Sequence, residues 1–504
     1  MTTIPILAAL LLGGQEKGHP LDGWFAAEWA RAGVKPGPPA DDAAFLRRAS
    51  LDLTGRLPDP EEVRAFLKST RRDKRVRTID QLLASPQAAD YFAHLWIQWL
   101  MGHEVTDGDL RALDLGGLVR WLKAAWEKDL PYDDLVRALL TSTGSLRENP
   151  PANYLAKYIV PGEPPAAAAG HAARLFLASD IRCAQCHDHP FERVTQEDFW
   201  SFAAFFRTLA RTREGLEELP APRAGKPRED VGELLAEPRF LDGRTPEPAE
   251  SRPAALARFI LTAPEDLAGR AIVDRVWMQL FGRRLSEDGR PGLQSLLVDL
   301  FRRGKGSLRG LVRLIVTSAA WQMSSEGTDA ARRAYTAGPL KMMNAVQFMR
   351  AWNYAFQYEA YFRALYEKDP AKAPFFEDPD LFWIGQTMAA KELIFPKGRD
   401  PEEVLASGTD RLAIKLMNSR DLQLLMVARF QATGQLGLVW KVIRTTQDPS
   451  RRLDELFLLL VSRPPTASER GWLLPYVKGV ANPFHAWSDV FWMLLNSSEF
   501  VFVG

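Results

Sequence analysis

The sequence predicts a mainly α-helical protein of two multi-helix domains, joined by an irregular linker rich in proline and charged residues. Apolar residues recur at helical spacing in both halves of the chain, as at Leu118, Trp121 and Leu122. Helix-start signals occur near both ends of the sequence, and long alternating strand patterns are missing. We therefore expect fewer than about one residue in ten in strands, against a usual share of about 20–25%.

Composition narrows the classes of protein to which this chain can belong. The 504 residues, 46% apolar and 25% charged, suit a soluble globular protein with a substantial core. A formal net charge of +1 supplies no long-range field, so we expect no nucleic-acid partner. No apolar run approaches the roughly 20 residues that a membrane helix needs, which predicts no integral membrane segment.

The N-terminal residues predict a signal peptide over residues 1–18. Residues 4–12 form an apolar run that is too short to cross a bilayer but fits the core of a signal peptide. The small residues Gly13 and Gly14 follow it, near a cleavage point. We therefore expect an extracytoplasmic protein, either periplasmic or secreted.

The domain boundary is expected within residues 213–252, which are rich in Pro, Glu, Gly and Arg. This composition is typical of a linker or an irregular connection. Residues 19–212 then form the first helical domain and residues 253–504 the second. We expect each of these two domains to have its own core.

Two helix-start signals share a short pattern. Residues 59–62 read Asp-Pro-Glu-Glu, which places a capping residue, a first-turn proline and a glutamate in order. Arg56 precedes Glu62 in the same way that Arg463 precedes Glu469, with proline between them in both cases. We interpret the pattern as a shared turn between two helices, and expect each arginine to bond carbonyls at the end of the preceding helix.

The segment 183–187 reads Cys-Ala-Gln-Cys-His and contains both cysteines of the chain. In c-type haem attachment, the two thiols of such a motif add across the haem vinyl groups and the histidine binds the iron. The motif therefore predicts haem c held by Cys183 and Cys186, with His187 as the metal ligand, on one helical turn. Four aromatic residues nearby in sequence are expected to wall a haem-sized cavity beside His187: Phe176, Phe191, Trp200 and Phe202.

Two other interpretations of the motif stay open. Zinc could use Cys183 and Cys186 with His187 or His189, although structural zinc sites normally draw on a second separated pair of ligands, which is not visible. A disulfide or a dithiol also fits two cysteines at this spacing. Either would make the chain a non-enzymatic interaction or structural module, whereas haem favours electron transfer or redox catalysis.

The iron of a haem could be five-coordinate, or its opposite face could take a ligand from elsewhere in the chain. His189 cannot supply it, because two residues of chain reach about 7 Å at most. The candidates for this distal position are His94, Met101, His103 and His171. Sequence signatures of serine hydrolases, phosphate-binding loops, dinucleotide-binding folds and zinc proteases are absent, so no catalytic residues are predicted.

Several segments resemble the planctomycete cytochrome-like domain family (PSCyt of the second type, domain of unknown function 1549) and its companion PSD domain (domain of unknown function 1553). Residues 45–63 resemble the opening signature of the first domain, and residues 182–191 resemble its cysteine segment. Residues 270–282 and 492–501 resemble the companion domain. The resemblance implies an exported, helical, two-domain protein that binds haem through Cys183, Cys186 and His187. It also implies partner proteins in redox chemistry or in glycan degradation.

Overall fold

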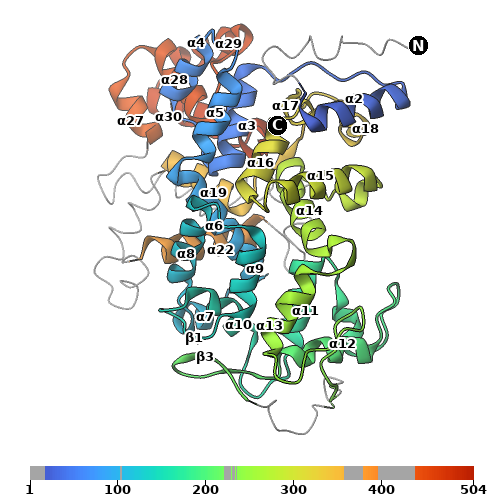
Figure 1. Ribbon diagram of the computed structural model, residues 1–504. Helices are drawn as coiled ribbons and strands as arrows, with labels where there is room; N and C mark the ends of the chain where they lie inside the picture. Colours follow the sequence, from blue (N-terminus) through green and yellow to red (C-terminus); the bar gives the residue numbers. More distant parts are fainter. Residues whose placement is uncertain are drawn as a thin grey trace, which may run out of the picture. The chain divides into compact units, whose positions relative to one another are not determined.

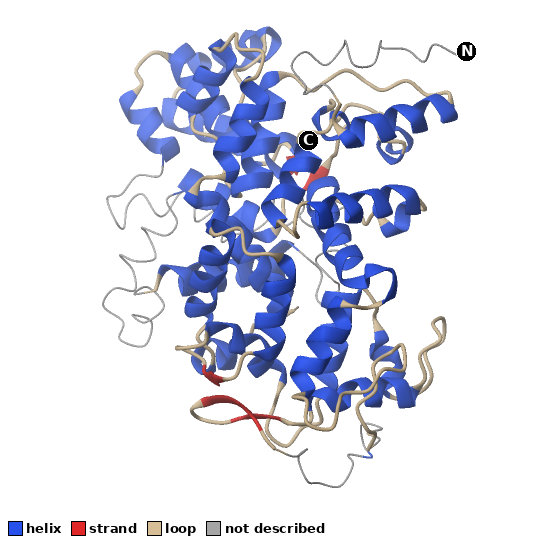
Figure 2. Cartoon of the chain, viewed as in Figure 1, coloured by secondary structure: helices blue, strands red, loops and turns tan. Residues whose placement is uncertain are grey.

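The computed structural model describes residues 18–102, 105–220, 229, 233, 235–356, 378–394 and 438–504. Of these residues, 65% are helical and 4% lie in strands, which confirms the predicted mainly α-helical class (Figure 2). No helix in this described part combines the length and the apolar character that crossing a bilayer requires. Most of the predicted signal peptide (residues 1–17) and His103 lie outside the described residues.

The chain forms two compact units, and each is assembled from segments that are distant in sequence (Figure 1). The first unit takes in the described residues of 1–91, 277–288 and 312–504, and the second those of 92–276 and 289–311. The division between the units falls within three helices, which are α6 (Pro86–Met101), α14 (Leu267–Phe281) and α16 (Leu308–Val316).

The first unit is helical except for one small sheet, in which β4 (Lys341–Met342) pairs antiparallel with β5 (Phe502–Val503). Its main buried apolar cluster contains Leu51, Phe348, Leu456 and Phe491, which come from four different helices. The other described elements of this unit are α2 (Pro20–Ala32), α3 (Asp42–Thr54), α4 (Pro60–Lys68), α5 (Lys74–Leu83), η6 (Ser286–Asp288), α17 (Ala319–Gln322), α18 (Asp329–Arg333), α19 (Ala345–Phe356), α22 (Pro379–Ile394), α27 (Leu438–Thr445), α28 (Pro449–Val461), α29 (Ala467–Gly479), α30 (Pro483–Leu495) and α31 (Ser498–Val501).

The second unit is also helical, with a three-stranded antiparallel sheet in the order β1-β3-β2. In this sheet Gly144 lies opposite Leu216, and Leu209 lies opposite Glu218. The described elements of this unit are α7 (Asp107–Ala112), α8 (Leu115–Glu127), α9 (Tyr132–Thr141), β1 (Gly144–Ser145), η1 (Pro150–Ala152), α10 (Asn153–Tyr158), α11 (Ala166–Leu177), η2 (Ile181–Gln185), α12 (Gln196–Ala203), η3 (Ala204–Phe206), β2 (Leu209–Arg211), β3 (Gly215–Glu218), α13 (Arg252–Leu261), η5 (Pro264–Asp266) and α15 (Pro291–Arg303).

The segment 213–252, expected as a linker, does not coincide with a boundary between the two compact units. It lies within the range of the second unit, where α9 and α13 come from either side of it and pack against each other. Leu139 on α9 and Ile260 on α13 are fully buried. Because each helix covers an apolar face of the other, they belong to one core, and residues 213–252 connect parts of that core.

Two helix-turn-helix segments of the first unit have the same local design. Helices α3 and α28 are both 13 residues long, and both end at a residue in the left-handed conformation. That residue is Gly55, with φ 68°, in one copy and Ser462, with φ 60°, in the other. The following helices, α4 and α29, both begin with a complete capping box, which confirms both sequence-predicted helix starts.

The arginine of each turn binds the glutamate of the capping box. Arg56 donates to the two carboxylate oxygens of Glu62 at 2.8 and 3.0 Å, and Arg463 donates to those of Glu469 at 2.8 and 2.9 Å. In both copies the arginine also donates to the carbonyl of the next residue at 3.2 Å. The expectation that these arginines bond the preceding helix is therefore wrong, since a carboxylate offers a stronger, two-oxygen partner.

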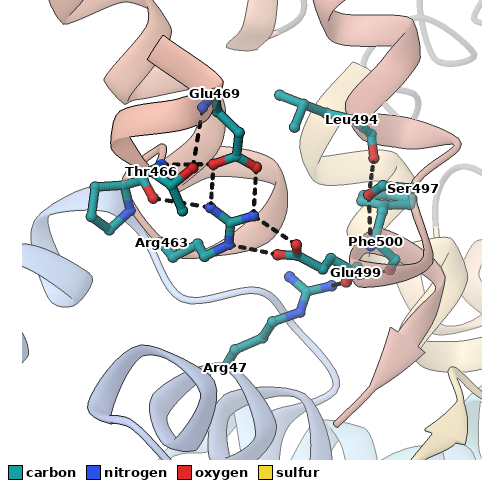
Figure 3. A network of polar contacts seen from close by, with 9 residues as sticks. Arg47, Arg463, Thr466, Glu469, Leu494, Ser497, Glu499 and Phe500 are labelled. Atoms are coloured by element: carbon teal, nitrogen blue, oxygen red, sulfur yellow. Dashed lines mark hydrogen bonds and ion pairs between the residues drawn. The ribbon is translucent and has the colours of Figure 1, made fainter. Parts of the chain in front are cut away.

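One carbonyl at the end of α28, that of Leu460, accepts instead from Arg47 of α3. Figure 3 shows Arg47 beside Glu499 and Phe500, next to the turn that contains Arg463. The Nη1 of Arg47 donates to the Leu460 carbonyl at 3.0 Å, and its Nη2 donates to the Glu499 and Phe500 carbonyls at 2.6 and 3.1 Å. Arg47 is buried, and this burial lowers its pKa to about 10. The Glu499 side chain accepts from Arg463 at 2.6 and 2.7 Å, so one network ties α3, the α28–α29 turn and the C-terminal segment together.

Replacing Arg47 by methionine is expected to destabilise the protein by about 3 kcal/mol, because two buried carbonyls and one part-buried carbonyl lose their donor. Urea unfolding followed by far-UV circular dichroism measures the loss. The matched control is Arg64→Met, which removes an ion pair between an exposed arginine and Glu455 and should cost less than about 1 kcal/mol. Equal losses in the two variants would contradict the role assigned to Arg47.

Replacing Glu469 by glutamine tests the ion pair of the second turn. Hydrogen bonds from Arg463 lower the pKa of Glu469 to about 2, below its ordinary value of 4.5. The stabilisation by this carboxylate is therefore complete above pH 4.5 and is lost as the pH falls towards 2.

We expect Glu469→Gln to cost on the order of 1 kcal/mol at pH 7 and to weaken the dependence of stability on pH below 4.5. Urea unfolding at pH 7 and pH 3 measures both effects. Glu62→Gln, at the equivalent and more exposed position, serves as the control and should cost less. A larger loss of stability in Glu62→Gln than in Glu469→Gln would show that solvent exposure does not determine how much each ion pair stabilises the protein.

Candidate functional site

The Cys-Ala-Gln-Cys-His segment lies on the surface of the second unit, on the 3-10 turn η2 and the residues that follow it. Cys183 belongs to η2, and Cys186 is its C-terminal capping residue, with φ −109° and ψ −22°. Side chains three residues apart eclipse each other in a 3-10 helix. The two cysteines therefore lie on the same side of the turn, while Ala184 between them is fully buried.

All three residues that carry the predicted chemistry are accessible. Cys183 and Cys186 are free thiols with exposed side chains, and His187 is exposed as well. The Nδ1 atom of His187 lies 2.7 Å from the backbone carbonyl oxygen of Asp188. A carbonyl can only accept a hydrogen bond, so Nδ1 carries the proton, and in the neutral ring Nε2 is left with its lone pair.

The turn is held against α11 by close packing at Gly170. A Cβ atom at this glycine would lie 2.6 Å from Cγ of Arg182, so a larger residue there would displace the turn. Arg182 also pairs with Asp180, and its hydrogen bonds lower the pKa of that carboxyl group. The contact fixes the residue that directly precedes Cys183.

Helix α12 holds the turn from its other side. Its capping box, in which Thr195 and Asp198 exchange hydrogen bonds, starts the helix at Gln196. The side chains of Gln196 and Trp200 both donate to the carbonyl oxygen of Gln185. The sequence contained the signal for these contacts, namely a capping box followed by two polar-tipped side chains four residues apart, but motif analysis did not use it.

His189 stabilises the loop that follows the motif. The His189 Nδ1 atom accepts hydrogen bonds from the backbone N–H groups of Phe191 and Glu192 at 3.2 and 2.9 Å. The backbone N–H of His189 donates to the Val194 carbonyl at 2.8 Å. The loop presents the Phe191 ring to solvent with 94% of its surface exposed. This exposed phenylalanine, five residues after Cys186 and eight after Cys183, is an apolar surface that a ligand or a partner would cover.

The aromatic residues expected to wall a haem cavity do not do so. Phe176, Trp200 and Phe202 are all buried in the core of the second unit, because the helices that carry them pack their apolar faces together. Only Phe191 is exposed. Cys183 and His187 are exposed too, so the motif lies on the surface, and three of the four aromatic side chains expected beside it are buried in the core instead.

The distal-ligand candidates have different surroundings. His94 and Met101 are buried in α6. His171 belongs to α11, which contacts η2, and it follows the glycine on which Arg182 packs. Its Nδ1 lies 3.2 Å from the Tyr154 hydroxyl, and its ring stacks on Tyr158 with the two centroids 4.4 Å apart.

The side chains that could bind a metal ion are His, Cys, Asp and Glu. Within the described part of the chain, no three of them converge on a position that would hold a metal ion. Cys183, Cys186 and the nearby histidines therefore do not form the tetrahedral arrangement that a structural zinc ion needs. The exposed thiols and imidazole are arranged for a ligand that approaches from solvent.

Both thiols should react quickly in the native, reduced protein, because neither is shielded by other side chains. We expect iodoacetamide to modify both, at rates within about tenfold of those in urea. Peptide mass spectrometry after timed quenching gives the two rates, and Cys183→Ser and Cys186→Ser identify each one. If either thiol reacted more than a hundredfold more slowly in the native protein than in urea, the exposure of the two thiols would be contradicted.

Two family models match the chain, and both describe proteins of unknown function. The first, PSCyt2 (DUF1549), matches residues 20–211, and the second, PSD1 (DUF1553), matches residues 252–351. The first match contains the cysteine motif, and the order of the two is that expected from the sequence. No curated protein and no solved structure matches the chain. The chain therefore contains a region that matches the PSCyt2 model, followed by a region that matches the PSD1 model.

Proposed function

We propose that this protein is an exported carrier of covalently attached haem c, bound through Cys183, Cys186 and His187, and that it serves electron transfer or redox catalysis. The observation that carries the proposal is the joint exposure of these three side chains on one short turn. A bound haem would supply a redox-active iron at this surface.

The two cysteines fit thioether formation. Each Sγ would form a bond to one carbon of a vinyl group while the thiol hydrogen passes to the other carbon, so no oxidant is needed. Both sulfurs must reach one edge of the porphyrin, and eclipsed positions on a 3-10 turn place them on one side. Both are free thiols, as this addition requires.

The imidazole of His187 fits the role of an iron ligand. Its Nδ1 proton is donated to the Asp188 carbonyl, which fixes the tautomer and orients the ring. Nε2 then offers its lone pair to a metal, as is usual for ligating histidines. Phe191, almost fully exposed in the same loop, would supply one apolar contact to a flat hydrophobic ligand.

Export supports the same proposal. Residues 4–12 form the apolar core of a signal peptide in the sequence, and covalent haem on this motif is a feature of proteins outside the cytoplasm. The alternatives are a zinc site and a reversible disulfide. The exposed dithiol favours the disulfide over zinc, since the nearby histidines do not complete a set of metal ligands within the described residues.

Expression of the full chain with a cytochrome c maturation system is expected to give a Soret band and a mass increase of one haem. Cys183→Ala combined with Cys186→Ala should abolish both, because no thioether can form. His187→Ala should keep attached haem but change its axial ligation, read by absorption and electron paramagnetic resonance. The matched control is His189→Ala, which should leave the iron ligation unchanged, since His189 holds the loop.

Three results would decide against this function. A matured wild-type protein without Soret absorbance would rule out haem attachment. One equivalent of zinc that is lost in the double cysteine variant would indicate a metal site instead. Reversible loss of two free thiols on oxidation, without haem or zinc, would indicate a dithiol.

A further inference from the structure

The carbonyl oxygen of Gln185 is a fixed point in the middle of the cysteine motif. It accepts a hydrogen bond from Nε2 of Gln196 at 3.2 Å and another from Nε1 of Trp200 at 3.1 Å. Gln196 and Trp200 are four residues apart in α12, so they lie on the same face of that helix. Two donors from one rigid element thus hold a single backbone group between the two cysteines.

The same helix also holds the other end of the motif. The backbone N–H of Gln196 donates to Oδ1 of Asp188 at 2.9 Å. Asp188 in turn follows His187 and accepts the His187 Nδ1 proton at its carbonyl. The first turn of α12 is therefore connected to the residue before Cys186 and to the residue after His187.

The contact between Trp200 and the Gln185 carbonyl is partly shielded from water on the inner side of the turn. Trp200 is 1% exposed, and Ala184, which precedes Gln185, is fully buried. A hydrogen bond between buried groups is stronger than one in water, and breaking it leaves an unsatisfied polar group. The inner side of the turn is thus fixed, and the eclipsed cysteines are directed outward from it.

We propose that Gln196 and Trp200 are positioning residues for the Cys183–Cys186 pair. By holding the Gln185 carbonyl they keep the 3-10 turn, and the turn keeps the two sulfurs on one exposed side at a set spacing. The proposal deepens the proposed function, because haem attachment needs both sulfurs at one porphyrin edge. It concerns the dithiol itself, however, and can be measured in protein without haem.

The spacing has a measurable consequence in that haem-free protein. Three residues of a 3-10 helix rise about 6 Å, which lies within the range of Cα separations that a disulfide accepts. A turn that is held in place gives the two thiols a high effective concentration. Releasing the Gln185 carbonyl lets the turn sample other conformations and lowers that concentration, which destabilises the disulfide relative to the dithiol.

The experiment equilibrates the haem-free full chain with glutathione. Two protein thiols and one glutathione disulfide give one protein disulfide and two glutathione thiols, and mass spectrometry after acid quenching gives the equilibrium constant. Trp200→Phe keeps an aromatic ring but deletes the donor, and Gln196→Met keeps the length but deletes the other donor. Gln196→Lys restores a donor at the same position.

We expect Trp200→Phe and Gln196→Met each to lower the equilibrium constant by about threefold to tenfold, where tenfold corresponds to about 30 mV in a two-electron couple. Gln196→Lys should recover most of the loss. Trp29→Phe is the matched control, because Trp29 Nε1 donates to the Ala334 carbonyl at 3.1 Å in the other unit. That variant should leave the equilibrium unchanged.

Far-UV circular dichroism and the unfolding temperature show whether each variant folds, and the half-exposed Gln196 provides a test that does not alter the core. Unchanged equilibria in folded Trp200→Phe and Gln196→Met would overturn the proposal, as would an equal shift in Trp29→Phe. If the equilibria shift as expected but wild-type protein never attaches haem, the positioning role stands and the proposed function fails. If haem attaches normally and the equilibria do not shift, the proposed function stands and the positioning role fails.

Discussion

The buried guanidinium of Arg47 must be surrounded by acceptors, since burying a charge without partners costs several kcal/mol. Its partners include the carbonyls of Leu460, Glu499 and Phe500, so α3 is bound to the end of α28 and to the C-terminal segment. A second buried pair, Lys341 and Asp52 at 2.6 Å, links α3 to β4 in the same unit. The first unit is therefore defined by polar contacts between segments hundreds of residues apart, and its apolar cluster fills the space between them.

The two helix-turn-helix segments of the first unit use the same set of short-range contacts. In both copies a left-handed residue ends a helix, an arginine folds back onto the capping-box glutamate, and a new helix starts. The second copy adds Glu499 as a further partner for its arginine, which connects the turn to the C-terminal segment. The contacts within the turn are the same in both copies, but only in the second does the turn also bind the C-terminal segment.

At the cysteine site, packing and hydrogen bonds hold the inner side of the turn η2, and the outer side of the turn is open to solvent. Gly170 lets η2 approach α11, and α12 holds the Gln185 carbonyl. Phe176, Trp200 and Phe202 are buried in the core of the second unit. Phe191 is exposed, as are the two thiols and the His187 imidazole. A surface dithiol that is supported in this way suits a ligand or partner that arrives from solvent.

The sequence by itself determined the helical class, the capping boxes at Asp59 and Thr466 and the chemistry available at Cys183–His187, because all of these depend on residues within a few positions of one another. Tertiary structure alone decided the grouping of the chain into units, since α9 and α13 pack across the segment that resembled a linker. It also decided that Phe176, Trp200 and Phe202 are core residues and that Gln196 and Trp200 hold the motif. An aromatic residue near a motif can face either the core or a ligand, and only the packing of distant helices determines which.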